Sequence, residues 1–194
     1  MKKNFASIAF TPSVKALQEF YGSRTAYERM EKLSVTDGLS DNEIRFIGHS
    51  DSFFMATNSE SGFPYIQHRG GPRGFVKVLD DKRIGFLDFT GNRQYITAGN
   101  LATDNKVALI MVDYPSQSRL KIYATAEIIG LEANKGLYDL LDLPGYKFRA
   151  ERIMLLHIEA YDWNCPQHIT PRYTIDEIQR VMEMQGKDGE PPTL

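Results

Sequence analysis

The chain has 194 residues, with 23 Lys or Arg against 25 Asp or Glu, so its formal charge at pH 7 is −2. This length suits one domain, or one domain with appended helices, and such a domain needs no metal or disulfide to build its core. The balanced charge, with no long run of one sign, argues against a nucleic-acid partner, because binding a phosphate backbone usually leaves a basic face in the composition.

The single cysteine, Cys165, excludes an intrachain disulfide and fits a reducing compartment. The opening M-K-K-N-F-A-S-I-A-F has an apolar patch too short for a secretory signal, and no apolar run approaches the ~20 residues of a membrane-spanning helix. We therefore expect a cytoplasmic protein without a membrane partner. Cys165 and His168 have the spacing of half a metal site, but no second ligand cluster follows, so we predict no metal and a buried thiol.

Two helices are predicted before the first strand. Thr11 can cap a helix that starts at Pro12, and Gly22 is expected to end it. Ser40 and Glu43 have the spacing of a capping box, which predicts a second helix beginning there.

From Ser52 onward, short segments rich in Phe, Val, Ile and Tyr alternate with turn residues, a pattern typical of strands. The segments are S-F-F-M-A-T, F-P-Y-I-Q-H-R, F-V-K-V-L and R-I-G-F-L-D-F around the turn Asp80-Asp81, Lys106 to Asp113, Leu120 to Ile129, and Arg152 to Trp163. With Arg152 to Trp163 as the sixth strand, we expect a mainly β protein in which a six-stranded antiparallel barrel carries peripheral helices.

Three further helices are predicted, at Gln94 to Asn105, at Asn134 to Leu143, and from Thr174 to about Gln185. The polar tail from Gly186 to Leu194 is expected to be disordered. Three segments follow from this pattern: an N-terminal helical extension at residues 1–48, the barrel at residues 49–174, and a C-terminal helix with its tail at residues 175–194.

Two arginines, Arg69 and Arg93, lie near turns between apolar runs, where their guanidinium groups could hold a phosphate. Arg93 directly precedes a predicted helix, whose N-terminal dipole would add to its charge, and Gly91 and Asn92 allow a close approach. The pattern indicates a phosphorylated cofactor. The alternative is an ion pair with a nearby acid such as Asp88.

The motifs P-Y-I-Q-H-R-G-G-P, F-T-G-N-R-Q-Y and D-W-N-C-P-Q-H-I-T-P-R resemble those of the pyridoxamine 5'-phosphate oxidase-like family, and the resemblance extends from about Phe46 to Thr174. It implies an FMN-binding split β-barrel that forms a homodimer around its cofactor. It also implies an oxidoreductase that transfers a hydride between a small organic substrate and FMN, with oxygen or a nicotinamide nucleotide as the second partner.

The resemblance also implies which residues contact the cofactor. The phosphate would be bound by Arg69, Asn92, Arg93 and the adjacent Gln94; the ring would be lined by Tyr65, Ile66, Gln67 and His68; and its far face would be approached by Trp163 and Arg172, which in the family commonly come from the second subunit. Trp163 could equally be a core aromatic that ends a strand. No catalytic residue is predicted.

The chain also departs from the oxidase itself. The oxidase strand R-x-V-L-L-K is replaced by P-Y-I-Q-H-R, its S-R-K by G-N-R-Q, and its R-x-H by P-Q-H-I-T-P-R. We therefore expect a branch of short relatives that does not oxidise pyridoxamine phosphate. Two alternatives stay open: a non-catalytic flavin-binding or redox-sensing module, and a relative that binds a deazaflavin or haem, the latter through an axial histidine such as His68 or His157.

Overall fold

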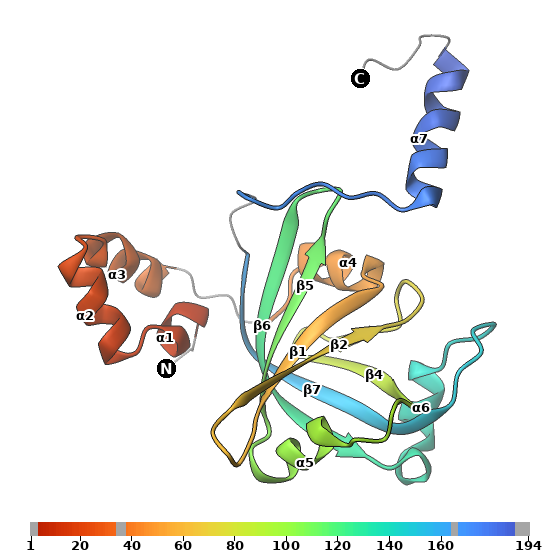
Figure 1. Cartoon of the computed structure of the whole chain (residues 1–194), viewed down its shortest axis with the longest axis horizontal. Coiled ribbons are helices and arrows are strands. Elements are labelled where there is room, and N and C mark those ends of the chain that lie inside the picture. The colour runs from red at the N-terminus through yellow and green to blue at the C-terminus, as the bar shows by residue number, and fades with distance from the viewer. Residues whose placement is uncertain (1–3, 34–37, 164–166, 189–194) are drawn as a thin grey trace.

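The computed structural model describes residues 4–33, 38–163 and 167–188. Within these ranges one antiparallel sheet has seven strands, in the order β2-β1-β5-β6-β7-β4-β3, and curls into a barrel (Figure 1). The strands are β1 (Ser52–Asn58), β2 (Pro64–Gly70), β3 (Lys77–Asp80), β4 (Arg83–Phe89), β5 (Lys106–Asp113), β6 (Ser118–Ile129) and β7 (Ala150–Trp163). The predicted number of six is one too low, although the seven predicted segments, with both halves of the hairpin at Asp80-Asp81, all form strands.

The described part of the chain also contains helices. They are α1 (Phe5–Ala9), α2 (Pro12–Phe20), α3 (Arg24–Leu33), α4 (Asp41–His49), α5 (Ile96–Thr103), the 3-10 turn η1 (Leu131–Ala133), α6 (Lys135–Leu141) and α7 (Ile175–Asp188). The caps predicted for α2 and α4 are confirmed: Thr11 accepts a bond from the N–H of Val14, and Ser40 and Glu43 form a capping box.

Two predicted helices differ in length from their expected ranges. The helix expected at Gln94 to Asn105 forms only as α5, because Tyr95 has a left-handed backbone conformation that α-helix cannot include. Helix α7 continues to Asp188, three residues into the tail expected to be disordered. The rest of that tail, and Cys165, lie outside the described residues.

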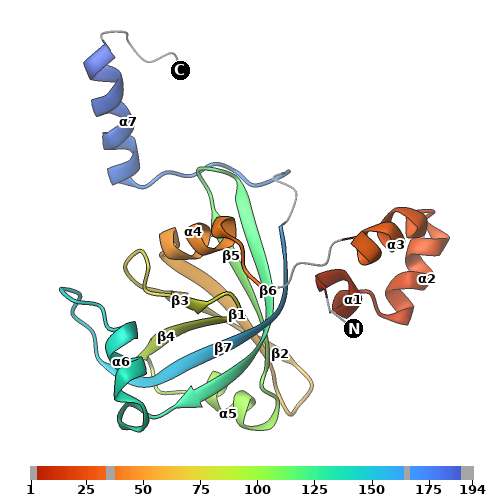
Figure 2. The same cartoon turned by 180° about the vertical axis from the view of Figure 1, so that it is seen from behind.

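Helices α1 and α3 were not expected from the sequence. Helix α1 has five residues, a length that shows no helical repeat, and depends on a capping box between Asn4 and Ser7. Together with α2 they lie beside the barrel, while α7 extends away from it (Figures 1 and 2). The N-terminal helices contact the barrel through Phe5, whose ring stacks on Tyr123 at a centroid distance of 4.5 Å and lies below the ammonium of Lys121.

Aromatic side chains from opposite sides of the barrel meet in its core. The ring of Phe53 on β1 lies 5.8 Å from that of Phe75 and 5.3 Å from that of Phe86 on β4. Helix α4 covers one end of the barrel and inserts Ile47, which is fully buried. Burial of these side chains brings β1 and its neighbour β2 close to β4, although β2 and β4 are not paired strands.

Strand β4 is buried on both faces, because α6 packs against its outer side. Leu87, Leu141 and Ile153 form a small second core there. The polar residue that follows, Asp88, is consequently 9% exposed. No helix within the described ranges combines the length and the apolar character that crossing a bilayer would require.

Candidate functional site

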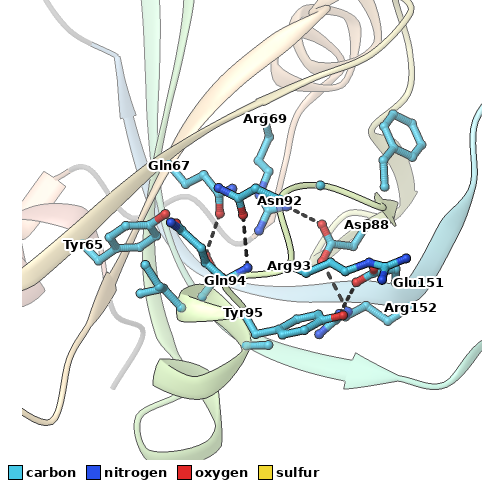
Figure 3. A pocket seen from close by; sticks show the side chains of 15 residues that line it. Tyr65, Gln67, Arg69, Asp88, Asn92, Arg93, Gln94, Tyr95, Glu151 and Arg152 are labelled. Carbon is cyan, nitrogen blue, oxygen red and sulfur yellow. Dashed lines mark hydrogen bonds and ion pairs between the residues drawn. The ribbon is translucent and has the colours of Figure 1, made fainter.

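A hollow of about 50 Å³ opens between β2, the β4–α5 loop and the start of β7 (Figure 3). Its lining residues are Tyr65, Gln67, Arg69, Asp88, Phe89, Gly91, Asn92, Arg93, Gln94, Tyr95, Ile96, Thr97, Ala98, Glu151 and Arg152. A second hollow of about 210 Å³ is also lined by Arg69 and Asp88 and extends to Phe75 and Phe86 in the core. We call the first of these the arginine hollow.

Strand β2 contributes every second residue to the arginine hollow. Tyr65, Gln67 and Arg69 are half-buried and line it, whereas Ile66 and His68 are exposed on the opposite face of the strand. The ring of His68 packs against Phe54, at 5.3 Å between centroids, and His68 also lines the 210 Å³ hollow. This division follows from the two-residue period of a strand.

The loop of residues 90–95 supplies the second wall. Arg93 and Tyr95 have φ angles of 60° and 56°, a left-handed conformation that costs a non-glycine residue roughly 1–2 kcal/mol. Asn92 steadies the turn by accepting a 3.2 Å bond from the N–H of Gln94. Arg93 is exposed and forms no ion pair with any residue of the described ranges, so its charge is available at the mouth of the hollow.

Helix α5 begins at the hollow with no side-chain cap on its first N–H groups. Uncapped amides at a helix N-terminus carry a partial positive charge and readily bind anions. Two side-chain bonds hold the helix in place: Thr97 Oγ1 donates to Gln67 Oε1 at 2.9 Å, and the buried Asn100 Nδ2 donates to Thr57 Oγ1 at 2.9 Å.

The Asn100→Ala variant is expected to lose about 1–3 kcal/mol of unfolding free energy, because it leaves the buried Thr57 hydroxyl without its partner. Urea denaturation followed by far-ultraviolet circular dichroism measures this change. Asn58→Ala, on the exposed bond to Asp104, is the matched control and should change stability by less than about 0.5 kcal/mol. Equal losses in the two variants would contradict the anchoring role of Asn100.

Three arginines and two acids meet at the arginine hollow. Arg69 on β2 forms an ion pair with Asp88 on β4, and Asp88 Oδ2 lies 3.4 Å from Nε of Arg152 on β7. Arg152 also bonds to Glu151 at 2.5 Å and lies over the ring of Tyr95 at 5.2 Å (Figure 3). The ion pair between Arg69 and Asp88 joins β2, one edge of the sheet, to β4 across the split in the barrel.

This cluster leaves part of its hydrogen-bonding capacity unused. The Nε atoms of Arg69 and Arg152 are buried and have no hydrogen-bond partner. Burial raises the pKa of Asp88 above its ordinary value, although Arg69 and Arg152 act in the opposite direction. With both acids ionised, three guanidinium groups face two carboxylates, and the hollow has a net positive charge suited to an anion.

Two of the predicted site residues, Trp163 and Arg172, do not line the arginine hollow. Trp163 packs edge-on against Phe46 and donates a 2.5 Å bond from Nε1 to Glu43 on α4. Arg172 stacks over Tyr114, at 4.8 Å, and lines a separate hollow of about 380 Å³ next to α4. Within the single chain, therefore, neither of them borders the arginine hollow.

Asp88 and Arg152 join the site although neither was predicted to contact a ligand. Asp88 was expected only as a possible ion-pair partner of the arginines, and the pair with Arg69 confirms that interpretation for Arg69. Arg152 meets Asp88 because the two residues are opposite each other in the register of β4 and β7. No local sequence pattern indicates that register.

Within the described residues, His, Cys, Asp and Glu form no group of three that could hold a metal ion. His157, one of the two histidines considered for haem, lies 3.2 Å from Glu127 on the neighbouring strand.

Comparison with known proteins places this chain in a family. The family model for pyridoxamine 5'-phosphate oxidase matches residues 40–140, just over half of the chain. No curated protein matches. Among solved structures, HupZ of Group A Streptococcus is 18% identical with a TM-score of 0.52, over 70% of this chain and 99% of its own. A predicted pyridoxamine 5'-phosphate oxidase of Lactobacillus delbrueckii is 23% identical with a TM-score of 0.50, over 67% and 97%.

The two structural similarities establish a shared fold, and the family match covers β1 to β6 and the whole β4–α5 loop. The arginine hollow is built largely from this matched region, with only Glu151 and Arg152 beyond it. The chain therefore belongs to the pyridoxamine 5'-phosphate oxidase family of flavin-binding split β-barrels.

Proposed function

We propose that this protein is a cytoplasmic, homodimeric FMN-binding oxidoreductase that holds the FMN phosphate in the arginine hollow. The observation that carries the proposal is the meeting of Arg69, Arg93 and the uncapped N-terminus of α5 at one hollow. A guanidinium fork and helix amides are the two groups that proteins most often use for phosphate. Membership of a flavin-binding family supports FMN as the molecule that carries this phosphate.

The Nε atoms of Arg69 and Arg152 fit this assignment, since neither has a hydrogen-bond partner and a phosphate oxygen would supply an acceptor; Nε of Arg152 is only within ion-pair distance of Asp88, at 3.4 Å. Charge-assisted hydrogen bonds contribute about 1.5–3 kcal/mol each, while micromolar affinity requires about 8 kcal/mol. Contacts to the flavin ring must therefore supply part of the affinity. Tyr65 offers an aromatic face and Gln67 an amide beside the phosphate end of the hollow.

The size of the site supports a second subunit. Pockets that enclose a cofactor or a drug-sized ligand measure roughly 300–1,000 Å³, larger than either hollow that Arg69 lines. A surface from outside the chain is needed to cover the ring. A second copy that brings Trp163 and Arg172 would provide an indole and a guanidinium for the purpose, in keeping with their expected role.

Bound FMN would accept or donate the hydride, and the protein would position it and exclude water. We propose a small organic substrate and a nicotinamide nucleotide as the exchange partners. Ile66 and His68 remain proposed ring contacts, from the face of β2 opposite Tyr65. A flavin carrier without its own substrate is the alternative, and steady turnover with a panel of small reductants would count against it.

Parallel titrations with FMN and riboflavin test the assignment of the phosphate. Riboflavin has the same ring without the phosphate, so FMN is expected to bind at least about 100-fold more tightly, the equivalent of about 3 kcal/mol of phosphate contacts. Quenching of flavin fluorescence on binding gives both dissociation constants. Equal constants would contradict the phosphate site, and no binding of either compound would contradict the flavin assignment as a whole.

A further inference from the structure

Asp88 carries its charge among the arginines of the arginine hollow. Its carboxylate contacts Arg69 and Arg152, and it lines both hollows that Arg69 lines. The side chains of Arg69 and Asp88 are 13% and 12% exposed, so water screens this charge only weakly. An incoming phosphate must share these guanidinium groups with a carboxylate that already holds them.

We propose that Asp88 is an internal counter-ion of the phosphate site, which has to take up a proton for a dianionic phosphate to bind tightly. The inference rests on the proposed function, and it adds a regulatory property: binding of FMN is coupled to pH through one residue. In the ligand-free protein the Asp88 carboxylate offsets part of the charge of Arg69 and Arg152. In the complex the phosphate replaces that charge and Asp88 is neutral.

The charges around Asp88 favour this exchange. Arg69 faces it from β2, Arg152 and Glu151 come from β7, and Arg93 lies on the adjoining loop. With Asp88 ionised, the three arginines have a net charge of +1 after both acids are counted. With Asp88 protonated, the net charge is +2, which matches a phosphate dianion. The protonated carboxyl can also donate a hydrogen bond to a phosphate oxygen, whereas a carboxylate only accepts.

The burial that raises the pKa of Asp88 makes this protonation easier than for an exposed aspartate, and a neighbouring dianion raises the pKa further. The affinity for phosphate should then fall as pH rises from the pKa of free Asp88 to its pKa in the complex. Each bound FMN should take up as much as one proton within that interval. Above the interval the affinity levels off.

Isothermal titration calorimetry of FMN binding, in two buffers of different ionisation enthalpy from pH 5.5 to 8.5, tests this coupling. Wild-type protein is compared with Asp88→Asn, which keeps an oxygen acceptor for Arg69, and with Asp104→Asn as the matched control, since Asp104 bonds to Asn58 outside the arginine hollow. The second ionisation of the phosphate, near pH 6, affects all three proteins alike. We expect the wild type and Asp104→Asn to take up protons on binding FMN, and we expect Asp88→Asn to take up none at this position and to bind FMN about tenfold or more tightly than the wild type at pH 8.

The possible results of this calorimetry separate the inference about Asp88 from the proposed function. Wild-type protein that binds FMN with no proton uptake beyond that of Asp88→Asn would overturn the inference while leaving the flavin site intact. Weaker binding by Asp88→Asn at every pH would also overturn it and make Asp88 a residue that only positions Arg69. If Asp88→Asn does not fold, as judged by its melting curve, proton uptake by the wild type still decides. Wild-type protein that binds no FMN would refute the proposed function and this inference together.

Discussion

Replacing both Arg69 and Arg93 by alanine is expected to weaken FMN binding by about 100- to 10,000-fold. Each guanidinium makes charge-assisted contacts that contribute about 1.5–3 kcal/mol, and every 1.4 kcal/mol corresponds to a factor of ten in the dissociation constant. The two side chains come from separate elements, β2 and the β4–α5 loop, and meet only at the arginine hollow. Fluorescence titration with FMN measures the effect.

The double variant needs two controls, because removing Arg69 also leaves Asp88 with Arg152 as its remaining charged partner. Arg83→Ala removes an arginine whose pair with Asp80 is half exposed, and it should leave FMN affinity unchanged. Riboflavin lacks the phosphate, so the double variant should bind it as the wild type does. An equal loss of FMN and riboflavin affinity would show that the arginines support the fold or the ring and not the phosphate.

Glu43→Ala is expected to reduce the free energy of unfolding by about 3–5 kcal/mol. The carboxylate is 4% exposed and accepts bonds from the N–H and hydroxyl of Ser40, from Tyr161 and from Trp163. It therefore caps α4 and also joins that helix to the end of β7. Its loss removes the cap and leaves the donors from Tyr161 and Trp163 without this acceptor. Urea denaturation at pH 7 measures the change.

Glu28→Ala is the control for this variant, because Glu28 forms an exposed pair with Lys32, and its removal should leave the free energy of unfolding nearly unchanged. Burial opposes ionisation of Glu43, but the bonds from Ser40, Trp163 and Tyr161 outweigh it and lower its pKa below the ordinary 4.5. The stability that Glu43 contributes is thus present above pH 4.5 and is lost as pH falls through the lowered pKa. A difference between wild type and Glu43→Ala that does not shrink below pH 4.5 would contradict this account.

Local signals in the sequence were sufficient to predict most of the helices and strands. The cap residues Thr11, Ser40 and Thr174 each mark the start of an observed helix, because a cap depends only on residues within one turn. The strands follow apolar segments bounded by turns. The segment that forms β3 was predicted as half of the hairpin around Asp80-Asp81, and only the count of six strands left one out.

The site was predictable in part. The sequence indicated that Arg69 and Arg93 could share a ligand, and both border the arginine hollow. Residues 65–68 were expected to line the ring as one run, whereas the strand period places Ile66 and His68 on the opposite face. Asp88 and Arg152 depend on strand register across more than sixty positions, which no local pattern encodes.

The left-handed conformations of Arg93 and Tyr95 could not be foreseen from residue type, because neither residue favours them. They start α5 later than expected, and the first residues of the helix, Ile96 to Ala98, line the hollow. Non-glycine residues in this conformation concentrate at ligand sites, where surrounding structure holds the strain. Trp163 and Arg172 lie outside the hollow in the single chain, and in the dimer that we propose they would reach it from the second subunit.

A crystal structure of the protein grown with FMN tests the central claim most directly. The account predicts the phosphate within hydrogen-bond distance of both Arg69 and Arg93, beside the N-terminus of α5, with the ring covered by a second copy of the chain. A flavin whose phosphate lies in the 380 Å³ hollow beside Arg172, or away from both arginines, would contradict it.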